Sequence, residues 1–184
     1  MKNILIVFLM TVTGSLYSQN KNNYTRYNNL IEVKGTEYVI ASIRNNGKFS
    51  SQNRYLLFIN TITGDSHPVN FAKGAYIRKI EQVKIDSLNI NKIIIQAKTI
   101  NYDGDNSIDW SDPSQILILS PDGLQKNQLT EDSFYLSTWV VNNQTGTITV
   151  TGHYDTNENF KYDKKDLNKI MIYDLKTLTL ISKI

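Results

Sequence analysis

Two acidic stretches of twelve residues carry the side chains of this sequence that are best suited to chemistry. The first covers residues 101–112 (NYDGDNSIDWSD) and the second covers residues 155–166 (DTNENFKYDKKD), so they lie 54 residues apart (155 − 101 = 54). Each stretch has Asp or Asn at its first, third, ninth and twelfth places. Oxygen-bearing side chains at this spacing can surround a hard cation such as Ca²⁺, which takes roughly six to eight oxygen ligands. The sequence therefore predicts two calcium loops.

The candidate ligands stand at places 1, 3, 5, 7, 9 and 12 of each stretch, and place 7 would contribute its backbone carbonyl. In the first loop they are Asn101, Asp103, Asp105, Ser107, Asp109 and Asp112. In the second loop they are Asp155, Asn157, Asn159, Lys161, Asp163 and Asp166. The first loop has four carboxylates on these places and the second has three, with further lysines nearby. We therefore expect the first loop to bind calcium more tightly.

The alternative is that both stretches are polar turns without a metal, because Asn and Asp fill surface turns by hydrogen-bonding their own backbone. Two observations favour calcium. The stretches recur in register within a repeat, and four carboxylates packed into a dozen residues without a cation would repel one another.

The spacing resembles the calcium loop of the EF-hand and dockerin families. The hydrophobic residue at place 8, Ile108 or Tyr162, also matches and would pin each loop to the core. Three features depart from the family pattern. The flanks read as strands and not helices, place 12 is Asp where the family has Glu, and place 6 is Asn106 or Phe160 where the family has Gly. Asn tolerates a positive φ, whereas Phe does not adopt one readily.

Strands must position these loops, because nearly all of the remaining chain consists of short apolar and β-branched runs between turn residues. No stretch of a dozen residues shows a helical apolar period, so we predict an all-β domain. The clearest runs are residues 38–43, 55–59, 92–97, 116–119, 147–151 and 170–173. Turns are expected at residues 46–47, 63–65, 121–123 and 142–146.

A repeat organises these strands. A shift of 54 residues superposes Ile94 on Ile148 and Ile116 on Ile170, so each unit reads as strand, acidic loop, strand, turn and strand. One more strand precedes each unit, at residues 77–85 and 137–141. A degenerate copy comes first, with strands at residues 30–33, 38–43, 55–60 and 67–71. Its loop, residues 44–54, has no carboxylate and is assigned no metal. Three four-stranded units of about 50 residues are typical of propeller blades.

Local motifs support this architecture. The segments LSPDG at 119–123 and QLT at 128–130, followed by Trp139, resemble the blade repeat of TolB-type and related WD40-like propellers. The resemblance implies that the S-P-D-G turn joins the two outer strands of a blade. It covers one blade well, the last blade weakly through residues 173–177, and the first hardly at all.

Propellers typically close with about 4–8 blades, so three units leave the ring open. Two chains could pair into a six-bladed homodimer, the units could stack as an open arc or packed sheets, or they could form a small barrel or sandwich. We expect a compact three-unit arrangement.

The N-terminus has the pattern of an exported protein. Lys2 precedes the apolar run ILIVFLM at 4–10, and residues 11–18 are mostly small and polar. This predicts a signal peptide at residues 1–18, a single domain at residues 19–184 and a secreted or periplasmic location. No cysteine is present, so disulfides are excluded. No second apolar segment could span a membrane after cleavage. The formal net charge of +3 comes from scattered residues, which argues against nucleic acid.

The sequence contains no catalytic motif of the G-x-S-x-G or H-E-x-x-H type. His67 and His153 are its only histidines, and we expect His153 to be a strand-end residue and not the partner of an acid–base pair. Trp110 is expected to fold back over the first loop. We therefore expect a non-enzymatic, calcium-binding module that binds an unknown protein or glycan. The alternatives are a calcium-dependent glycan or peptide hydrolase, or an accessory subunit that completes a propeller.

Overall fold

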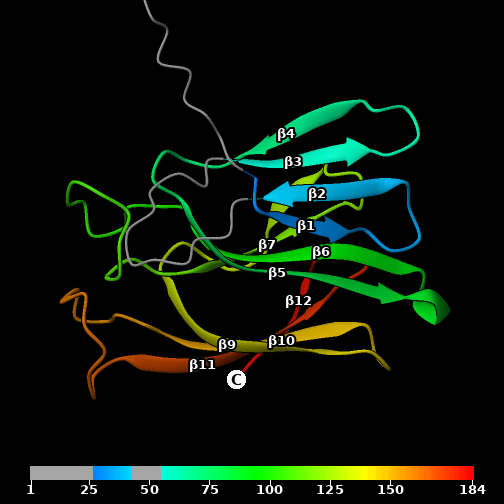
Figure 1. Cartoon of the computed structure of the whole chain (residues 1–184). Coiled ribbons are helices and arrows are strands. Elements are labelled where there is room, and N and C mark those ends of the chain that lie inside the picture. Colours follow the sequence, from blue (N-terminus) through cyan, green and yellow to red (C-terminus); the bar gives the residue numbers. More distant parts are fainter. Residues whose placement is uncertain (1–26, 43–54) are drawn as a thin grey trace, which may run out of the picture.

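The computed structural model describes residues 27–42 and 55–184. These residues form three four-stranded antiparallel sheets, each with its strands in chain order (Figure 1). The N-terminal sheet contains β1 (Asn29–Glu32), β2 (Tyr38–Ser42), β3 (Tyr55–Asn60) and β4 (Ser66–Asn70). The central sheet contains β5 (Tyr76–Ile85), β6 (Ile90–Lys98), β7 (Gln115–Leu119) and β8 (Lys126–Gln128), with the 3-10 turn η1 (Asp86–Leu88) between β5 and β6. The C-terminal sheet contains β9 (Phe134–Asn142), β10 (Thr147–Tyr154), β11 (Leu167–Asp174) and β12 (Leu180–Lys183).

The central sheet is covered on both faces, as Figure 1 shows. Ile94 and Ile118 pack in a core shared with the C-terminal sheet. Ile93 and Leu117 pack in a second core shared with the N-terminal sheet. β7 is buried at all five of its positions, QILIL. A strand with both faces buried requires a continuous apolar run, and each buried aliphatic side chain contributes about 1.5–3 kcal/mol.

The predicted all-β architecture of three four-stranded, propeller-like units is confirmed. β3 has the predicted bounds, and the other predicted strands overlap observed ones. The expected turns at residues 63–65, 121–123 and 142–146 connect β3 to β4, β7 to β8 and β9 to β10. In the described part of the chain the sheets form an open stack and do not close into a ring. This is the compact arrangement that the sequence favoured.

One detail of the predicted repeat is wrong. Ile93 and Ile148 both face the preceding sheet, which gives an offset of 55 residues before the loops (148 − 93 = 55). Ile94 faces the following sheet and therefore does not superpose on Ile148. After the loops, Leu117 and Met171 face the preceding sheet, with an offset of 54 (171 − 117 = 54). The second unit is one residue shorter here, and a one-residue slip turns every strand side chain to the other face.

Three predictions lie outside the described residues: the signal peptide at 1–18, the turn at 46–47 and the loop of the first copy at 44–54. Within the described ranges, no helix has the length and apolar character needed to cross a membrane.

Candidate metal centre

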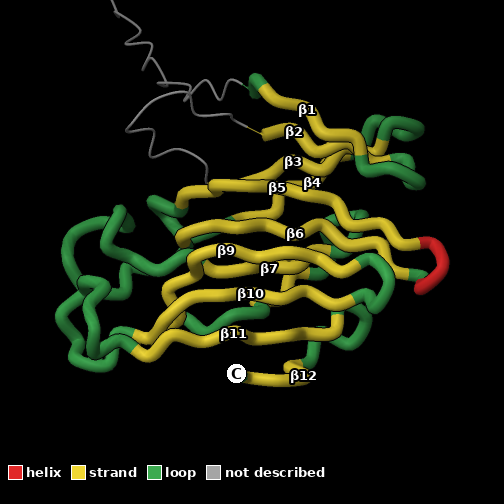
Figure 2. The backbone as a smooth tube through the Cα atoms, turned by 90° about the horizontal axis from the view of Figure 1, so that it is seen from below, coloured by secondary structure: helices red, strands yellow, loops and turns green. Residues whose placement is uncertain are grey.

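The two acidic loops make the same connection in successive sheets. The first loop joins β6 to β7, and the second joins β10 to β11. Both lie at the same end of the stack, opposite η1 (Figures 1 and 2). The repeat therefore carries the two loops to one end of the molecule.

The loops also share a local fold. In both of them the amide at place 7 donates to the side chain at place 5, the amide at place 11 donates to place 9, and the amide at place 9 donates to place 12. In the first loop these bonds run from Ser107 to Asp105 (2.7 Å), from Ser111 to Asp109 (2.8 Å) and from Asp109 to Asp112 (2.8 Å). In the second loop they run from Lys161 to Asn159 (2.8 Å), from Lys165 to Asp163 (2.7 Å) and from Asp163 to Asp166 (2.7 Å). The repeated Asp and Asn residues thus shape the loops.

The backbone reverses in each loop through left-handed residues. Gly104 and Glu158, both at place 4, have φ of 74° and 55°. At place 6 the outcome is the opposite of the expectation, because Phe160 adopts a φ of 55° and Asn106 does not have a positive φ. A left-handed conformation costs a residue with a side chain about 1–2 kcal/mol. The bond from the Phe160 amide to Asp155 Oδ2 (2.6 Å) helps to hold it there.

Three carboxylates converge in the first loop. Asp103, Asp105 and Asp109 each present an oxygen within 4.8 Å of the other two. Calcium–oxygen distances are about 2.3–2.6 Å, so oxygens around one Ca²⁺ lie at most about 5 Å apart. The Ser111 hydroxyl lies 2.6 Å from Asp103 Oδ2 and 2.7 Å from Asp109 Oδ1. Its hydrogen bond lowers the pKa of Asp109, which keeps that carboxylate ionised.

The other expected ligands of the first loop have different roles in this structure. Asp112 is 1% exposed, and its two oxygens accept the amides of Tyr102 (2.6 Å) and Asp109 (2.8 Å). These two hydrogen bonds connect the beginning and the middle of the loop to its last residue. The Asn101 amide group donates to the carbonyl of Asp105 (2.6 Å). Ser107 is exposed, and its amide donates to Asp105.

In the second loop the same places converge, but amide groups replace two of the carboxylates. Asn157 and Asn159 each donate from Nδ2 to Asp163 Oδ2, at 2.9 Å. The pKa of Asp163 is lowered, first by the amide of Lys165 and then by these side chains. Place 12 differs from the first loop. Asp166 is 7% exposed, and its Oδ1 is buried without a hydrogen-bond partner among the described residues. Such an oxygen needs a partner, and a cation would satisfy it.

Lys98 supports the first loop, and sequence reasoning missed it. It is 6% exposed at the end of β6, and its ammonium group donates to the backbone carbonyls of Trp110 (3.2 Å) and Asp112. Burial lowers its pKa, while Asp112 opposes that effect. Lys98 therefore supports the first loop from inside. A lysine that ends a strand directly before an acidic loop was the only sequence signal.

Replacing Lys98 with methionine should lower the free energy of unfolding by about 1–3 kcal/mol with chelator present, because the buried carbonyl of Asp112 and the partly buried carbonyl of Trp110 lose their donor. Urea unfolding of the two proteins measures this. Lys164→Met, at an exposed position of the second loop, is the control and should change stability by less than about 0.5 kcal/mol. An equal loss in both variants would contradict the supporting role of Lys98.

The hydrophobic residues of the loops behave less uniformly than expected. Ile108 is half-buried against Gly74, as the pinning role at place 8 requires. Tyr162 is 65% exposed and is not pinned to the core. Trp110 is 71% exposed, so the expectation that it folds back over the loop is wrong. Its backbone carbonyl is held by Lys98 while its ring faces solvent.

A row of aromatic rings joins the two loops. Tyr102 of the first loop contacts Phe160 of the second edge-on, with ring centroids 6.4 Å apart. Tyr102 also contacts Tyr135 of β9 (6.2 Å), and Tyr135 stacks on His153 of β10 (5.0 Å, 14° between planes). His153 then contacts Tyr162 (4.7 Å). His153 is therefore a stacked strand-end residue, as expected.

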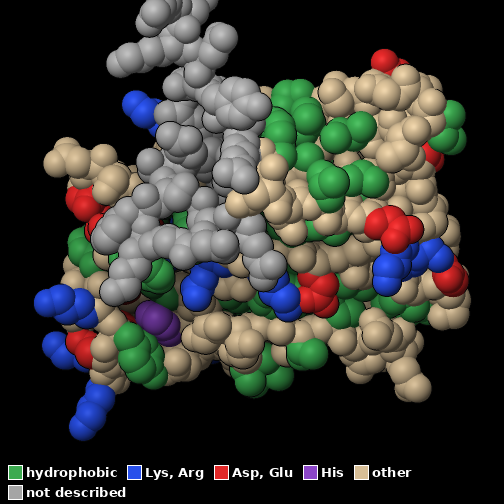
Figure 3. All heavy atoms as spheres, viewed as in Figure 1, with side chains coloured by type: hydrophobic (Ala, Val, Ile, Leu, Met, Phe, Trp, Pro, Cys, Tyr) green, Lys and Arg blue, Asp and Glu red, His purple; other side chains and the backbone are tan. Residues whose placement is uncertain are grey.

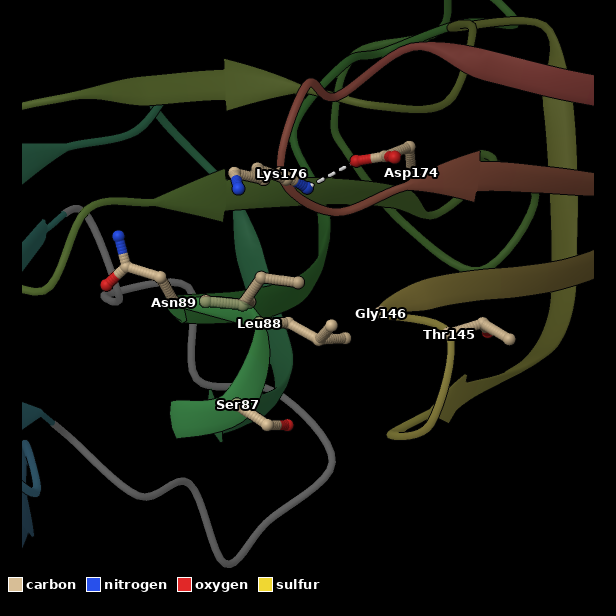
Figure 4. Close-up of a pocket in the computed structure, with 8 residues that line it drawn as sticks. Ser87, Leu88, Asn89, Thr145, Gly146, Asp174 and Lys176 are labelled. Carbon is tan, nitrogen blue, oxygen red and sulfur yellow. Dashed lines mark hydrogen bonds between the residues drawn. The ribbon is translucent and has the colours of Figure 1, made fainter.

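A cavity lies at the other end of the stack. It has a volume of about 350 Å³ and lies between η1 and the turns of the C-terminal sheet (Figure 4). Among its lining residues, Asp174 and Lys176 are the charged ones, and the Asp174 carboxylate accepts the Lys176 amide (2.6 Å). His67 lies elsewhere, stacked on Phe58 (5.7 Å). On the face that Figure 3 shows, basic and acidic side chains are interspersed.

The fold and the loops together define an all-β protein of three stacked, propeller-like sheets that carries paired acidic loops at one end. No protein-family model matches the chain, and neither does any curated protein.

Proposed function

We propose that this protein is an exported calcium-binding β-repeat module with a binding or structural role at the cell envelope or outside the cell. The observation that carries the proposal is the convergence of Asp103, Asp105 and Asp109 within 4.8 Å. Of these three carboxylates Asp103 is half-buried and the other two are exposed, and at this separation they repel one another, so that a cation between them would be favourable. The loop fold shared with the second copy supports the same proposal there.

Calcium suits these loops better than magnesium does. Ca²⁺ accepts an irregular set of carboxylate, amide and carbonyl oxygens, whereas Mg²⁺ requires near-octahedral geometry and retains several waters. The first loop offers this irregular set, because it combines converging carboxylates at places 3, 5 and 9 with an Asn side chain at place 1 and a backbone carbonyl at place 7. The Asn101 Oδ1 accepts the amide of Gly104 (3.0 Å) and its Nδ2 donates to the Asp105 carbonyl (2.6 Å), so Asn101 would have to give up or share these bonds to bind the ion.

A bound ion would fasten the crossing from β6 to β7, and a second ion would fasten that from β10 to β11. The chain has no cysteine, so no disulfide can do this. Rigid loops would in turn fix the exposed side chain of Trp110 at one end of the stack. An aromatic ring held beside a metal site is suited to contact a protein or a glycan, which is the binding role we propose.

Thermal melting tests the proposal. Calcium at about 100 times its dissociation constant should stabilise the protein by about 2.7 kcal/mol, because it binds the folded state alone. For a chain of this size, this corresponds to a rise in Tm of about 5–10 °C relative to a chelator-treated sample. Asp105→Asn should reduce the rise, since it removes a ligand charge but retains the acceptor for the Ser107 amide.

Sodium chloride at equal ionic strength is the control and should give at most a small shift. Magnesium should give less stabilisation than calcium. A Tm that is the same in calcium and in chelator would refute the proposal, and both loops would then be polar turns.

A further inference from the structure

The two loops are linked through the amides that their candidate ligands hold. Asp112 Oδ1 accepts the amide of Tyr102 at 2.6 Å. Asp155 Oδ2 accepts the amide of Phe160, also at 2.6 Å. The rings of Tyr102 and Phe160 then meet edge-on at 6.4 Å. Asp112 of the first loop is thus connected to Asp155 of the second through Tyr102 and Phe160.

Phe160 is held in an unfavourable backbone conformation where it makes this contact. Its φ of 55° is uncommon for an aromatic residue, and such conformations persist only when surrounding contacts impose them. Phe160 is 38% exposed, and Tyr102 is the aromatic ring that it contacts among the described residues. A shift of Tyr102 in the first loop would therefore remove a contact that helps to hold Phe160 in the second loop.

Tyr135 braces the same contact from β9. Its ring lies edge-on to Tyr102, 6.2 Å away with an interplanar angle of 87°. Its hydroxyl is buried and has no hydrogen-bond partner among the described residues. Burial first, and then the charge of Asp155, raises its pKa to about 12. Tyr135 therefore lies close enough to the second loop to sense the charge of one of its candidate ligands.

An independent observation indicates a cation at the second loop. Asp166 is 93% buried (100 − 7), and its Oδ1 lacks a partner within the described part of the chain. The matching oxygen of Asp112 is satisfied by the Tyr102 amide. The second loop therefore has a buried carboxylate oxygen without a donor, whereas a backbone amide satisfies the matching oxygen of the first loop.

We propose that the two loops bind calcium cooperatively, with Tyr102 and Phe160 as the coupling contact. This inference rests on the proposed function and adds the regulation of its two sites. Calcium held by Asp103, Asp105 and Asp109 would fix the backbone of Asp109, whose amide donates to the same carboxylate, Asp112, as the amide of Tyr102. An ordered Tyr102 then holds Phe160. The second loop then loses less conformational freedom when it binds its own ion, which makes the cooperativity positive.

Calcium titration calorimetry of the full chain tests the coupling. Asp105→Asn weakens the first loop, and Asp163→Asn weakens the second loop, while both retain hydrogen-bond acceptors. In the wild-type background, Asp105→Asn should weaken binding at the second loop about fivefold or more. Asp163→Asn should weaken the first loop by the same factor, because coupling between two binding sites is reciprocal.

Tyr102→Ala removes the coupling ring and leaves the backbone amide that bonds Asp112. In that background each loop's affinity should change by less than about twofold when the other loop is weakened. Tyr162→Ala is the matched control. It removes an exposed aromatic ring of the second loop that contacts His153 and no residue of the first loop in the described contacts, so it should leave the fivefold factor unchanged. Far-UV circular dichroism checks that each variant is folded.

The outcomes separate the two proposals. If no calcium binds the wild-type protein, both the proposed function and the coupling are overturned. If calcium binds both loops but weakening one leaves the other within twofold, only the coupling is overturned. If the fivefold change in affinity persists in the Tyr102→Ala protein, the coupling proposal is also overturned, because the ring contact would not be the cause of that change.

Discussion

Asp112→Ala is expected to lower the free energy of unfolding by about 2–6 kcal/mol in the presence of chelator. Asp112 is 1% exposed and accepts two backbone amides, from Tyr102 and Asp109. Both hydrogen bonds are partly buried, and an amide left without an acceptor in such a place costs up to about 1–3 kcal/mol. Urea unfolding measures the loss. Because calcium is absent, the result reports the part of Asp112 in the fold and not its part in metal binding.

Asp105→Ala is the matched control, since it removes a carboxylate of the same loop that is exposed. In chelator its effect should stay below about 0.5 kcal/mol. For calcium affinity the expected order is different. Asp105→Ala should weaken calcium binding markedly, because Asp105 belongs to the converging carboxylates. Equal losses for the two variants in chelator would show that Asp112 does not close the loop.

Gly152→Ala is expected to destabilise the protein by about 3 kcal/mol, because there is no space for a Cβ atom. An added Cβ would lie 2.2 Å from the carbonyl oxygen of Tyr135 and 2.6 Å from the ring of Phe134. The pairing of β10 with β9 shifts register at this point, which brings the β9 backbone close to Gly152. Phe134 is fully buried and cannot move away. Overpacking of this kind typically costs about 1–3 kcal/mol or more.

The same change should weaken the link between the loops. Tyr135 would have to move with its carbonyl, and its ring contacts Tyr102. Loss of near-ultraviolet circular dichroism from the aromatic rings, with unchanged far-ultraviolet signal, would report this movement.

Gly64→Ala is the control for Gly152→Ala. Gly64 has a φ of 80°, but no described atom lies within 4 Å of an added Cβ. Its cost should be about 1–2 kcal/mol and purely conformational. If Gly152→Ala were no more harmful than Gly64→Ala, the backbone of β9 would not approach β10 as closely as the structure has it.

The sequence by itself determined the strands and the main features of the loops. β3 has its predicted bounds because its apolar residues lie between clear turn signals. The side chains at places 3, 5 and 9 converge in both loops, as three Asp in the first and as Asn, Asn and Asp in the second, because these short side chains bond nearby amides. These are local interactions, and their patterns can therefore be recognised in a single stretch of chain.

Only the tertiary structure decided how the two loops differ and how they meet. Phe160 takes a conformation against its own preference because Asp155 and Tyr102 hold it. Lys98 is buried because the first loop folds over it. The pattern of strands along the chain does not predict this burial. Tyr135 joins the two loops only because β9 follows β8 into the next sheet. Contacts between residues far apart in the chain depend on how the sheets stack, and a local pattern of residues carries no information about that stacking.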